Sequence, residues 1–273
     1  MSLLGYWKLN DGPSTEPANA TDLSGHANNH DGTYYFSGTN YTYGALIVGG
    51  VHGRHLFSYN YGHVISPFNN ESDLILSGEM AIACWVRRSR DDTIFDFVAA
   101  GEAGSTQANN HQFCLTANAS NTVQLWWEHG SGTLVTANST VGILRGATEY
   151  DHIAAVRSLN GGGPNLNVNF YVNGVAAGLH SDLAPPDGGG SAKFFIGRDG
   201  NGANGYSQFL SSVRVWDNVG GLPDSAEILS IYNTEKASMD QLSKNEISIE
   251  IDQLSLPNYK AVIMGPNSPR ATL

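Results

Sequence analysis

The chain has few charged residues for its length. Charged side chains make up 14% of its 273 residues, well below the roughly one quarter that is usual in globular domains. Its polar character comes from Asn, Ser, Thr and Gly instead, and glycine alone occurs 32 times. Because glycine accepts the positive φ angles of tight turns, this composition favours a turn-rich all-β protein.

Cations are the scarcer sign, with 14 Lys and Arg against 25 Asp and Glu, which gives a formal net charge of −11. Nucleic-acid binding needs a basic surface, and an anionic membrane would repel this chain, so neither is an expected partner. Long apolar runs are also missing. The opening MSLLGYWKLN lacks the basic segment and the apolar length of a secretion signal, and no stretch would span a bilayer. We therefore expect no membrane insertion and no export by a signal peptide.

The chain has only two cysteines, Cys84 and Cys114, which are too few for a disulfide framework. Both lie in strand-like runs, so we expect buried free thiols, with a single bridge between neighbouring strands as the alternative. Motifs of several enzyme classes are missing as well, because the sequence contains no HExxH, no G-x-S-x-G and no Walker loop. These absences favour a non-catalytic protein.

Short strand-like runs recur along the chain with turn residues between them, a pattern typical of a β-sandwich. The clearest unit is NVNFYVNGVAAG (167–178), in which Val168, Phe170 and Val172 share one face. Asn173-Gly174 then supplies the two positive-φ residues of a tight hairpin turn. The expected strands are 4–9, 32–35, 55–57, 63–65, 80–87, 95–100, 112–117, 122–128, 133–138, 150–157, 167–172, 193–197 and 209–216.

Helical signals are rare. PDSAEIL, from Pro223, places an N-cap before a short apolar pattern, which predicts one short helix near 224–232. Further on, EISIEIDQLSL (246–256) alternates apolar and polar residues and predicts a half-buried strand, and KAVIM (260–264) predicts another. These pieces are too few to form a core alone. We therefore expect an extended arm over 236–273 that docks on a partner subunit.

Five segments, in order along the chain, carry a family resemblance. They are GYWKLNDG with DLSGHANNHDGTY, GRHLFSYNYGHVISP, SDLILSGEMAIACWVRR, YDHIAAVRS with FYVNGVAAG, and the stretch from FFIGRDG to SIYN. Together they resemble the laminin-G-like, concanavalin A-like jelly-roll family over residues 4–234. The resemblance implies an all-β, antiparallel two-sheet jelly-roll sandwich over 1–234, followed by the arm over 235–273. It also implies that Trp85 and Trp216 lie in the core.

The densest candidate for a sugar site is Trp126-Trp127-Glu128-His129, because sugar sites combine aromatic platforms with hydrogen-bonding groups. Successive strand residues face opposite sides, so one tryptophan would face the core and the other, with His129, would form a platform. The alternative is that both tryptophans only cover the two sheet faces. The candidate ligand-binding residues, two of them from nearby loops, are Trp126, Trp127, His129, His111 and Tyr206.

Three aspartates, Asp11, Asp22 and Asp31, lie in or near the first long loop. Oxygen ligands on loops suit Ca²⁺, and some members of the family hold calcium, so calcium is the cofactor that this loop would bind. The alternative needs no metal, because Asp and Asn also cap turns through their own side chains.

Glucanases of this fold class carry E-x-D-x-x-E, which places two carboxylates on one face of a strand for glycoside hydrolysis. The nearest match here is Glu250-Ile251-Asp252, which lacks the second Glu and lies in the arm. We interpret this segment as the solvent face of a strand.

The family includes sugar-binding lectins, adhesion modules, glycosidase appendages and structural parts of phage particles, so the fold does not define a function. The missing secretion signal favours a non-catalytic structural or binding module of a phage virion, as a capsid-decorating or tail-associated protein assembled in the host cytoplasm. Its partners would be other virion subunits, or a second copy, through 236–273, and surface glycans. The alternatives are a free carbohydrate-binding, lectin-like adhesin and, third, a glycosidase.

Overall fold

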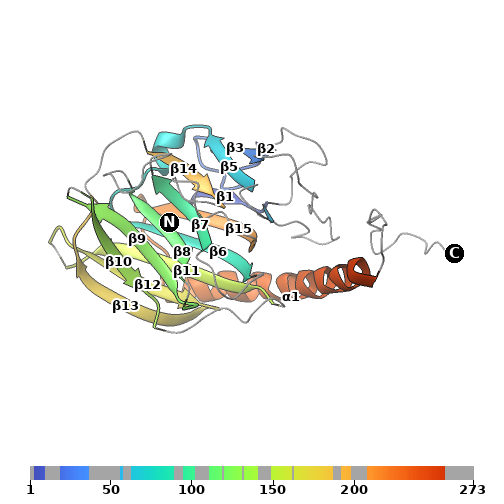
Figure 1. Cartoon of the computed structure of the whole chain (residues 1–273). Coiled ribbons are helices and arrows are strands. Elements are labelled where there is room, and N and C mark those ends of the chain that lie inside the picture. The colour runs from blue at the N-terminus through green and yellow to red at the C-terminus, as the bar shows by residue number, and fades with distance from the viewer. Residues whose placement is uncertain are drawn as a thin grey trace.

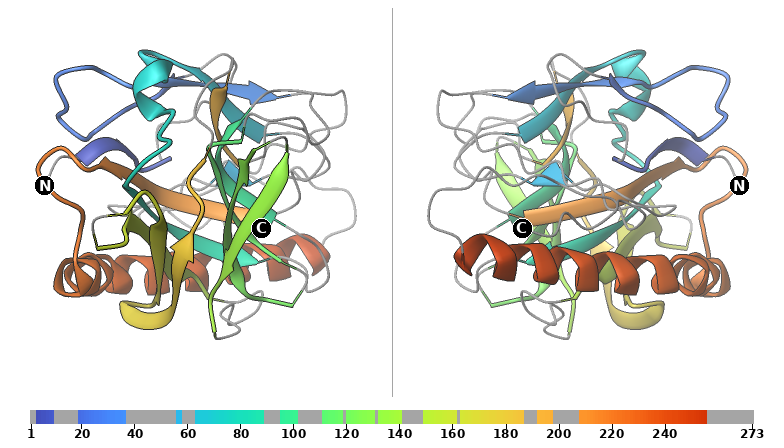
Figure 2. Two further views of the ribbon diagram at one scale, coloured as in Figure 1. Left: turned by 90° about the vertical axis from the view of Figure 1, so that its left-hand side faces the viewer. Right: turned by 90° about the vertical axis from the view of Figure 1, so that its right-hand side faces the viewer.

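The computed structural model describes residues 3–9, 19–36, 56–57, 63–88, 95–101, 111–118, 120–130, 132–140, 149–161, 163–186, 192–197 and 208–255. These residues form two antiparallel sheets packed face to face, and a long helix crosses the outer face of one of them (Figure 1, Figure 2). The predicted antiparallel two-sheet sandwich is confirmed.

The first sheet runs in spatial order through β1 (Leu3–Trp7), β15 (Gln208–Asp217), β6 (Met80–Arg88), β11 (Asp151–Leu159), β12 (Leu166–Val172) and β13 (Val175–Leu183), and β4 (Leu56–Phe57) also pairs with β15. The second sheet runs through β10 (Thr133–Asn138), β9 (Val123–His129), β8 (Phe113–Ala117), β7 (Phe95–Gly101), β14 (Lys193–Ile196), β5 (His63–Phe68), β3 (Gly32–Phe36) and β2 (Asn19–Ala20). A short 3-10 helix, η1 (Glu71–Leu74), follows β5. Each strand expected between residues 4 and 216 has a counterpart among these elements, and β2 and β13 are the two strands that the list of expected strands did not contain.

Aromatic side chains fill the space between the two sheets. Trp7 of β1 lies 5.2 Å from Phe68 and 5.7 Å from Phe194, measured between ring centroids, and both of these phenylalanines come from the second sheet. The indole N–H of Trp7 donates to the carbonyl of His30 at 3.0 Å, so its polar atom is satisfied as well. The predicted free thiols are confirmed, since Cys84 and Cys114 are both buried and unbridged.

A buried arginine connects the two sheets. Arg157 of β11 donates through Nε, Nη1 and Nη2 to the carbonyls of Gly78, Gln112 and Leu76, each at 2.8 Å. Its guanidinium also lies 5.2 Å from the ring of Trp127 in the second sheet. Burial lowers the pKa of Arg157 to about 9. The side chain therefore exchanges its hydration for three carbonyl oxygens and an aromatic face.

The helix α1 (Ser225–Ser255) corrects two predictions. A helix is present where one was expected, and Asp224 Oδ1 accepts the N–H of Glu227 at 2.9 Å as its N-cap. It continues far past 232, however, and the strand predicted over 246–256 is wrong, because α1 includes 246–255. No Gly or Pro interrupts 225–255, and Ile247 and Ile251 are also spaced by one helical turn. The first proline, Pro257, follows two residues after the helix ends.

The first part of α1 packs on the outer face of the first sheet, and Figure 2 shows the helix lying beside β15 and β6. Ile228 packs there among the small side chains of Ala81, Ala83 and Ala154 and against Trp216. Trp216 and Trp85 are both buried, as expected, but they lie under the helix and outside the space between the sheets. The predicted boundary between 234 and 235 falls within α1, and the expected strand at 260–264 lies outside the described residues.

The β12–β13 hairpin has the turn that the sequence predicts, with φ of 51° at Asn173 and 77° at Gly174. A Cβ added at Gly174 would lie 2.7 Å from Leu229 Cδ1 of α1.

We expect Gly174→Ala to lower the free energy of unfolding by about 1–2 kcal/mol. Backbone strain in the left-handed region and crowding of the new Cβ against the helix both contribute to this loss. Urea denaturation measures this loss. The control is Gly163→Ala, where the nearest atom to the new Cβ lies 3.8 Å away. Equal stabilities of the two variants would contradict the prediction.

Candidate functional site

Strand alternation separates the two adjacent tryptophans of β9. Trp127 points between the sheets, where it is fully buried and its indole N–H donates to the carbonyl of Ala184 at 2.8 Å. Trp126 points to the outer face of the second sheet and is half-buried. Of these two tryptophans, Trp126 is therefore the one that a ligand would reach, and Trp127 belongs to the core.

A buried histidine supports Trp126. The ring of His111 lies 4.8 Å from the ring of Trp126, and His111 itself is 3% exposed. Glu128, two residues after Trp126 and on the same side of β9, places its Oε1 3.6 Å from His111 Nδ1 and accepts the backbone N–H of His111 through Oε2 at 3.3 Å. Gly101 makes room for the ring, because a Cβ there would lie 2.3 Å from His111 Cδ2. Trp126, His111 and Glu128 therefore form one supported platform.

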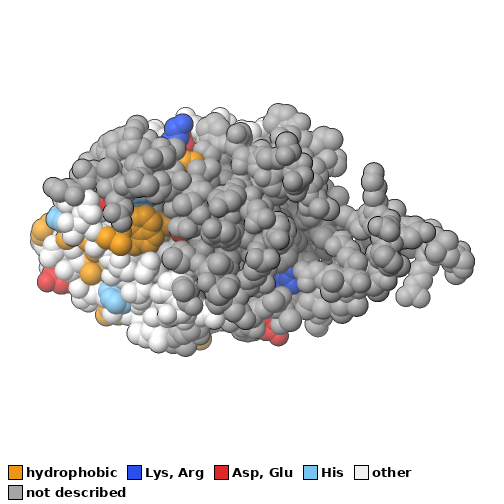
Figure 3. All heavy atoms as spheres, in the orientation of Figure 1, with side chains coloured by type: hydrophobic (Ala, Val, Ile, Leu, Met, Phe, Trp, Pro, Cys, Tyr) orange, Lys and Arg blue, Asp and Glu red, His pale blue; other side chains and the backbone are white. Residues whose placement is uncertain are grey.

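Uncharged hydrogen-bonding groups flank this platform on the outer face. Thr136 of β10 is the cross-strand partner of Trp126, and Gln124 pairs with Asn138 two residues further along the two strands. The amide of Gln124 donates to Asn138 Oδ1 at 2.9 Å. Leu134, opposite Glu128, is 59% exposed. Figure 3 shows the resulting surface as an apolar patch among uncharged polar atoms, on the face where β9 and β10 lie.

His129, another predicted ligand residue, does not join this cluster. His129 lies at the end of β9, half-buried, with Nδ1 2.7 Å from the carbonyl oxygen of Pro185. Tyr206 lies outside the described residues. The residues that the sequence analysis did not assign are Glu128, Gln124, Thr136 and Asn138. The alternation of residues along β9 and β10 indicates which side chains face outward. Only the register between the two strands shows that these four lie beside Trp126.

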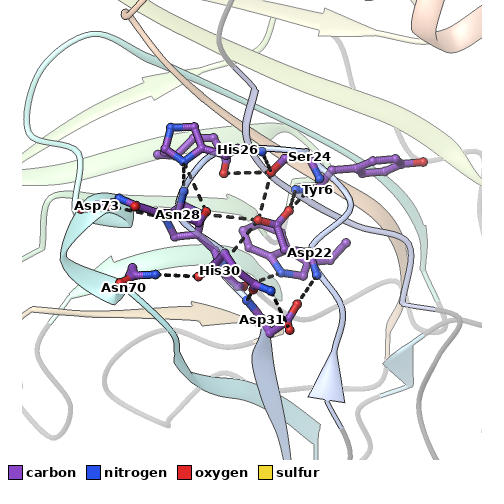
Figure 4. A network of polar contacts seen from close by, with 12 residues as sticks. Tyr6, Asp22, Ser24, His26, Asn28, His30, Asp31, Asn70 and Asp73 are labelled. Carbon is purple, nitrogen blue, oxygen red and sulfur yellow. Dashed lines mark hydrogen bonds and ion pairs between the residues drawn. The ribbon is translucent and has the colours of Figure 1, made fainter.

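The predicted metal residues Asp22 and Asp31 meet in a polar network drawn in Figure 4. Asp22 Oδ1 accepts the backbone N–H groups of Tyr6 and Ser24, both at 2.9 Å, and its Oδ2 accepts Ser24 Oγ at 3.0 Å and the N–H of His30 at 3.2 Å. Asp31 Oδ1 accepts the N–H of Asp22 at 2.7 Å. These carboxylates hold the turn through N–H and O–H donors, as in the metal-free alternative.

His30 connects this loop to η1. It is fully buried, with Nδ1 3.4 Å from Asp22 Oδ2 and Nε2 3.4 Å from Asp73 Oδ2. Asn28 also donates to Asp73 Oδ2 at 2.7 Å, and this hydrogen bond lowers the pKa of Asp73. Within the described part of the chain, no three His, Cys, Asp or Glu side chains are grouped so that they could hold a metal ion. Asp11 lies outside that part, and calcium binding stays a prediction.

The interpretation of Glu250-Ile251-Asp252 as the solvent face of a strand is wrong, because the segment is helical. Glu250 and Asp252 belong to α1, and positions two apart on a helix do not share a face. Among the described residues, no helix is long and apolar enough to cross a bilayer.

Two sheets in this order, with an aromatic platform on an outer face, define a lectin-like jelly-roll domain. The chain belongs to the concanavalin A-like lectin/glucanases superfamily, whose laminin G model matches residues 60–220. No curated protein sequence matches the chain.

Solved structures with a similar fold include binding domains of clostridial toxins. The receptor binding domain of botulinum neurotoxin mosaic serotype C/D is 10% identical, with a TM-score of 0.55 over 86% of this chain and 51% of that chain. The binding domain of Paraclostridial Mosquitocidal Protein 1 is 14% identical, with a TM-score of 0.55 over 85% and 52%. The binding domain of botulinum neurotoxin DC, in complex with rat synaptotagmin II, is 9% identical, with a TM-score of 0.52 over 85% and 51%. The chain spans about half the length of these domains, and at such identities the likeness concerns the fold.

Asp22 provides a test of the two interpretations of the first loop. We expect Asp22→Asn to lower the free energy of unfolding by about 1–3 kcal/mol in the presence of EDTA, because an amide nitrogen in place of one carboxylate oxygen leaves a buried N–H donor without its acceptor. Thermal unfolding measures the loss, and Asp182→Asn, at an exposed carboxylate, is the matched control. A wild-type melting temperature that rises with CaCl₂, in a way that Asp22→Asn abolishes, would instead assign a calcium site.

Proposed function

We propose that this chain is a non-catalytic binding module that recognises neutral glycans on the outer face of its second sheet, with Trp126 as the stacking platform. The observation that carries this proposal is the half-buried indole of Trp126 supported from below by the ring of His111 at 4.8 Å. A sugar ring presents C–H groups to an aromatic face and hydroxyls to its surroundings. Thr136, Gln124 and Asn138 offer hydroxyl and amide partners for those hydroxyls.

The charge of the molecule favours a neutral ligand. β9 and β10 contain no Lys or Arg that would pair with an acidic sugar, and the whole chain carries a net charge of −11. Glu128 is nearly buried and accepts the backbone N–H of His111, so it has a structural role that a catalytic acid would have to give up. The similar toxin domains are named as binding domains, which supports binding as the role of the fold.

Substitution of Trp126 tests the proposed glycan site. We expect Trp126→Ala to weaken the binding of neutral glycans by about 10- to 100-fold, since it removes the stacking surface. Trp126→Phe should keep part of the affinity. A glycan array followed by titration of the strongest ligand measures the change, and His129→Gln, outside the platform, should bind like the wild type. Undiminished binding by Trp126→Ala, or wild-type protein that binds no glycan, would refute the proposal.

We propose as a second role that the chain is a subunit of a phage particle, in the capsid or the tail, assembled in the host cytoplasm. The long helix α1 supports this role. Its last described buried side chain is Met239, and 240–255 continue for about 24 Å at the helical rise. Figure 1 shows this half of α1 extending away from the two sheets. It offers a segment through which 236–273 would bind other virion subunits or a second copy.

Mass spectrometry of purified phage particles tests the second role, with a fixed copy number per particle as the expected result. A chain that ends at Gln241 keeps the buried contacts of Glu235 and Met239, so it should fold and yet be missing from particles. Circular dichroism verifies its folding. Particles that incorporate the shortened chain at the normal copy number would show that the segment after 241 is not the attachment.

A further inference from the structure

The interface between α1 and the first sheet contains a buried histidine whose ring makes no hydrogen bond within the described part of the chain. His152 of β11 is fully buried on the outer face of the first sheet, as the cross-strand neighbour of Trp85. Its ring lies 5.2 Å from the ring of Trp85 and 6.3 Å from that of Tyr232 on α1. Among the described residues, neither ring nitrogen finds a hydrogen-bond partner. A neutral ring tolerates this environment, whereas an imidazolium would have two unsatisfied donors.

The charged groups around His152 are already matched to each other. Glu235 of α1 accepts Trp85 Nε1 at 2.7 Å, Tyr6 Oη at 3.2 Å and Arg214 Nη1 at 3.2 Å, and it also forms an ion pair with Arg214 Nη2. The groups facing His152 are thus Glu235 and Tyr232 from α1, Arg214 from β15 and Trp85 from β6. Burial disfavours a proton on His152 most strongly; the charge of Glu235 favours that proton, and the charge of Arg214 opposes it.

The consequence for pH has a definite sign. Burial lowers the pKa of His152 from 6.5 to about 3 while the helix covers it. Once α1 leaves the sheet, the ring meets water and returns to its ordinary pKa. The contribution to docking is therefore fully present above the ordinary pKa of 6.5 and is lost as pH falls from there toward about 3.

We propose that the first half of α1 is an acid-released cover, and that protonation of His152 detaches it from the outer face of the first sheet while the sandwich stays folded. Two observations indicate that α1 can detach without unfolding of the sandwich. The side chains under α1, among them Ala81, Ala83 and Trp216, form a cluster separate from the core between the sheets. Three polar contacts between α1 and the sheet, with Tyr6, Trp85 and Arg214, converge on Glu235 within one helix turn. Release would expose Trp85 and this apolar face in an acidic environment.

Hydrogen exchange on the full chain tests the proposal. With intrinsic exchange rates corrected for pH, we expect the protection of amides in 228–240 to fall about 100-fold between pH 7.5 and 4.5, since each pH unit below the free pKa of His152 shifts the equilibrium about tenfold. Amides of β8 and β9 in the second sheet should keep their protection. Equal protection of α1 at both pH values, or loss of protection in β8 and β9 together with α1, would overturn the proposal.

Variants at the interface separate His152 from other acid effects. His152→Phe keeps an aromatic ring without a titratable group, so the protection of α1 should become nearly independent of pH. His152→Met serves the same purpose if the phenylalanine variant fails to fold. Glu235→Gln weakens docking at both pH values but should keep the response to acid, and His26→Gln, in the loop between β2 and β3, should behave like the wild type. A His152→Phe or His152→Met variant that still releases α1 in acid would overturn the assignment to His152.

Discussion

The strict alternation of side chains along each β-strand is the constraint on which this structure depends. It sends Trp127 between the sheets and leaves Trp126 on the outer face. It also places Trp85 on the outside of the first sheet, although Trp85 is as deeply buried as a core residue. The first sheet is therefore buried against the second sheet on one face and, on part of the other, against α1. Each face needs its own apolar partner, and the helix supplies the second.

Burial of polar groups distinguishes the two outer faces. Under α1, Glu235 and Arg214 neutralise each other, and His152 remains neutral because burial disfavours its charged form. Behind Trp126, the contact between His111 and Glu128 holds the indole in place. Both sites use a buried histidine beside an aromatic ring, but with opposite consequences. The first makes the helix sensitive to acid, and the second gives a ligand a rigid surface whose shape is set before binding.

Much of the sandwich could be predicted, because its strands have local signals. The hairpin at Asn173-Gly174 and the two-residue period of β9 and β12 need no distant information. The prediction failed over 246–256, where alternating isoleucines resemble a strand and the same residues also fit a helix. Local period alone could not decide there, whereas a run of 31 residues without Gly or Pro carried the helical signal. The candidate site was predicted in part. The sequence indicated Trp126 and His111 as ligand residues, but it did not predict that their rings are in contact.

The sequence by itself determined the family, the turns and the strand periods, because these depend on neighbours within a few residues. It also limited the chemistry, since a chain with a net charge of −11 and only two cysteines has few ways to bind anions or build bridges. Only the tertiary structure decided which tryptophan faces outward, which carboxylate holds a turn and which histidine is buried under a helix. Those outcomes depend on register between strands far apart in the chain and on the docking of α1, because burial and charge pairing are properties of the assembled surfaces.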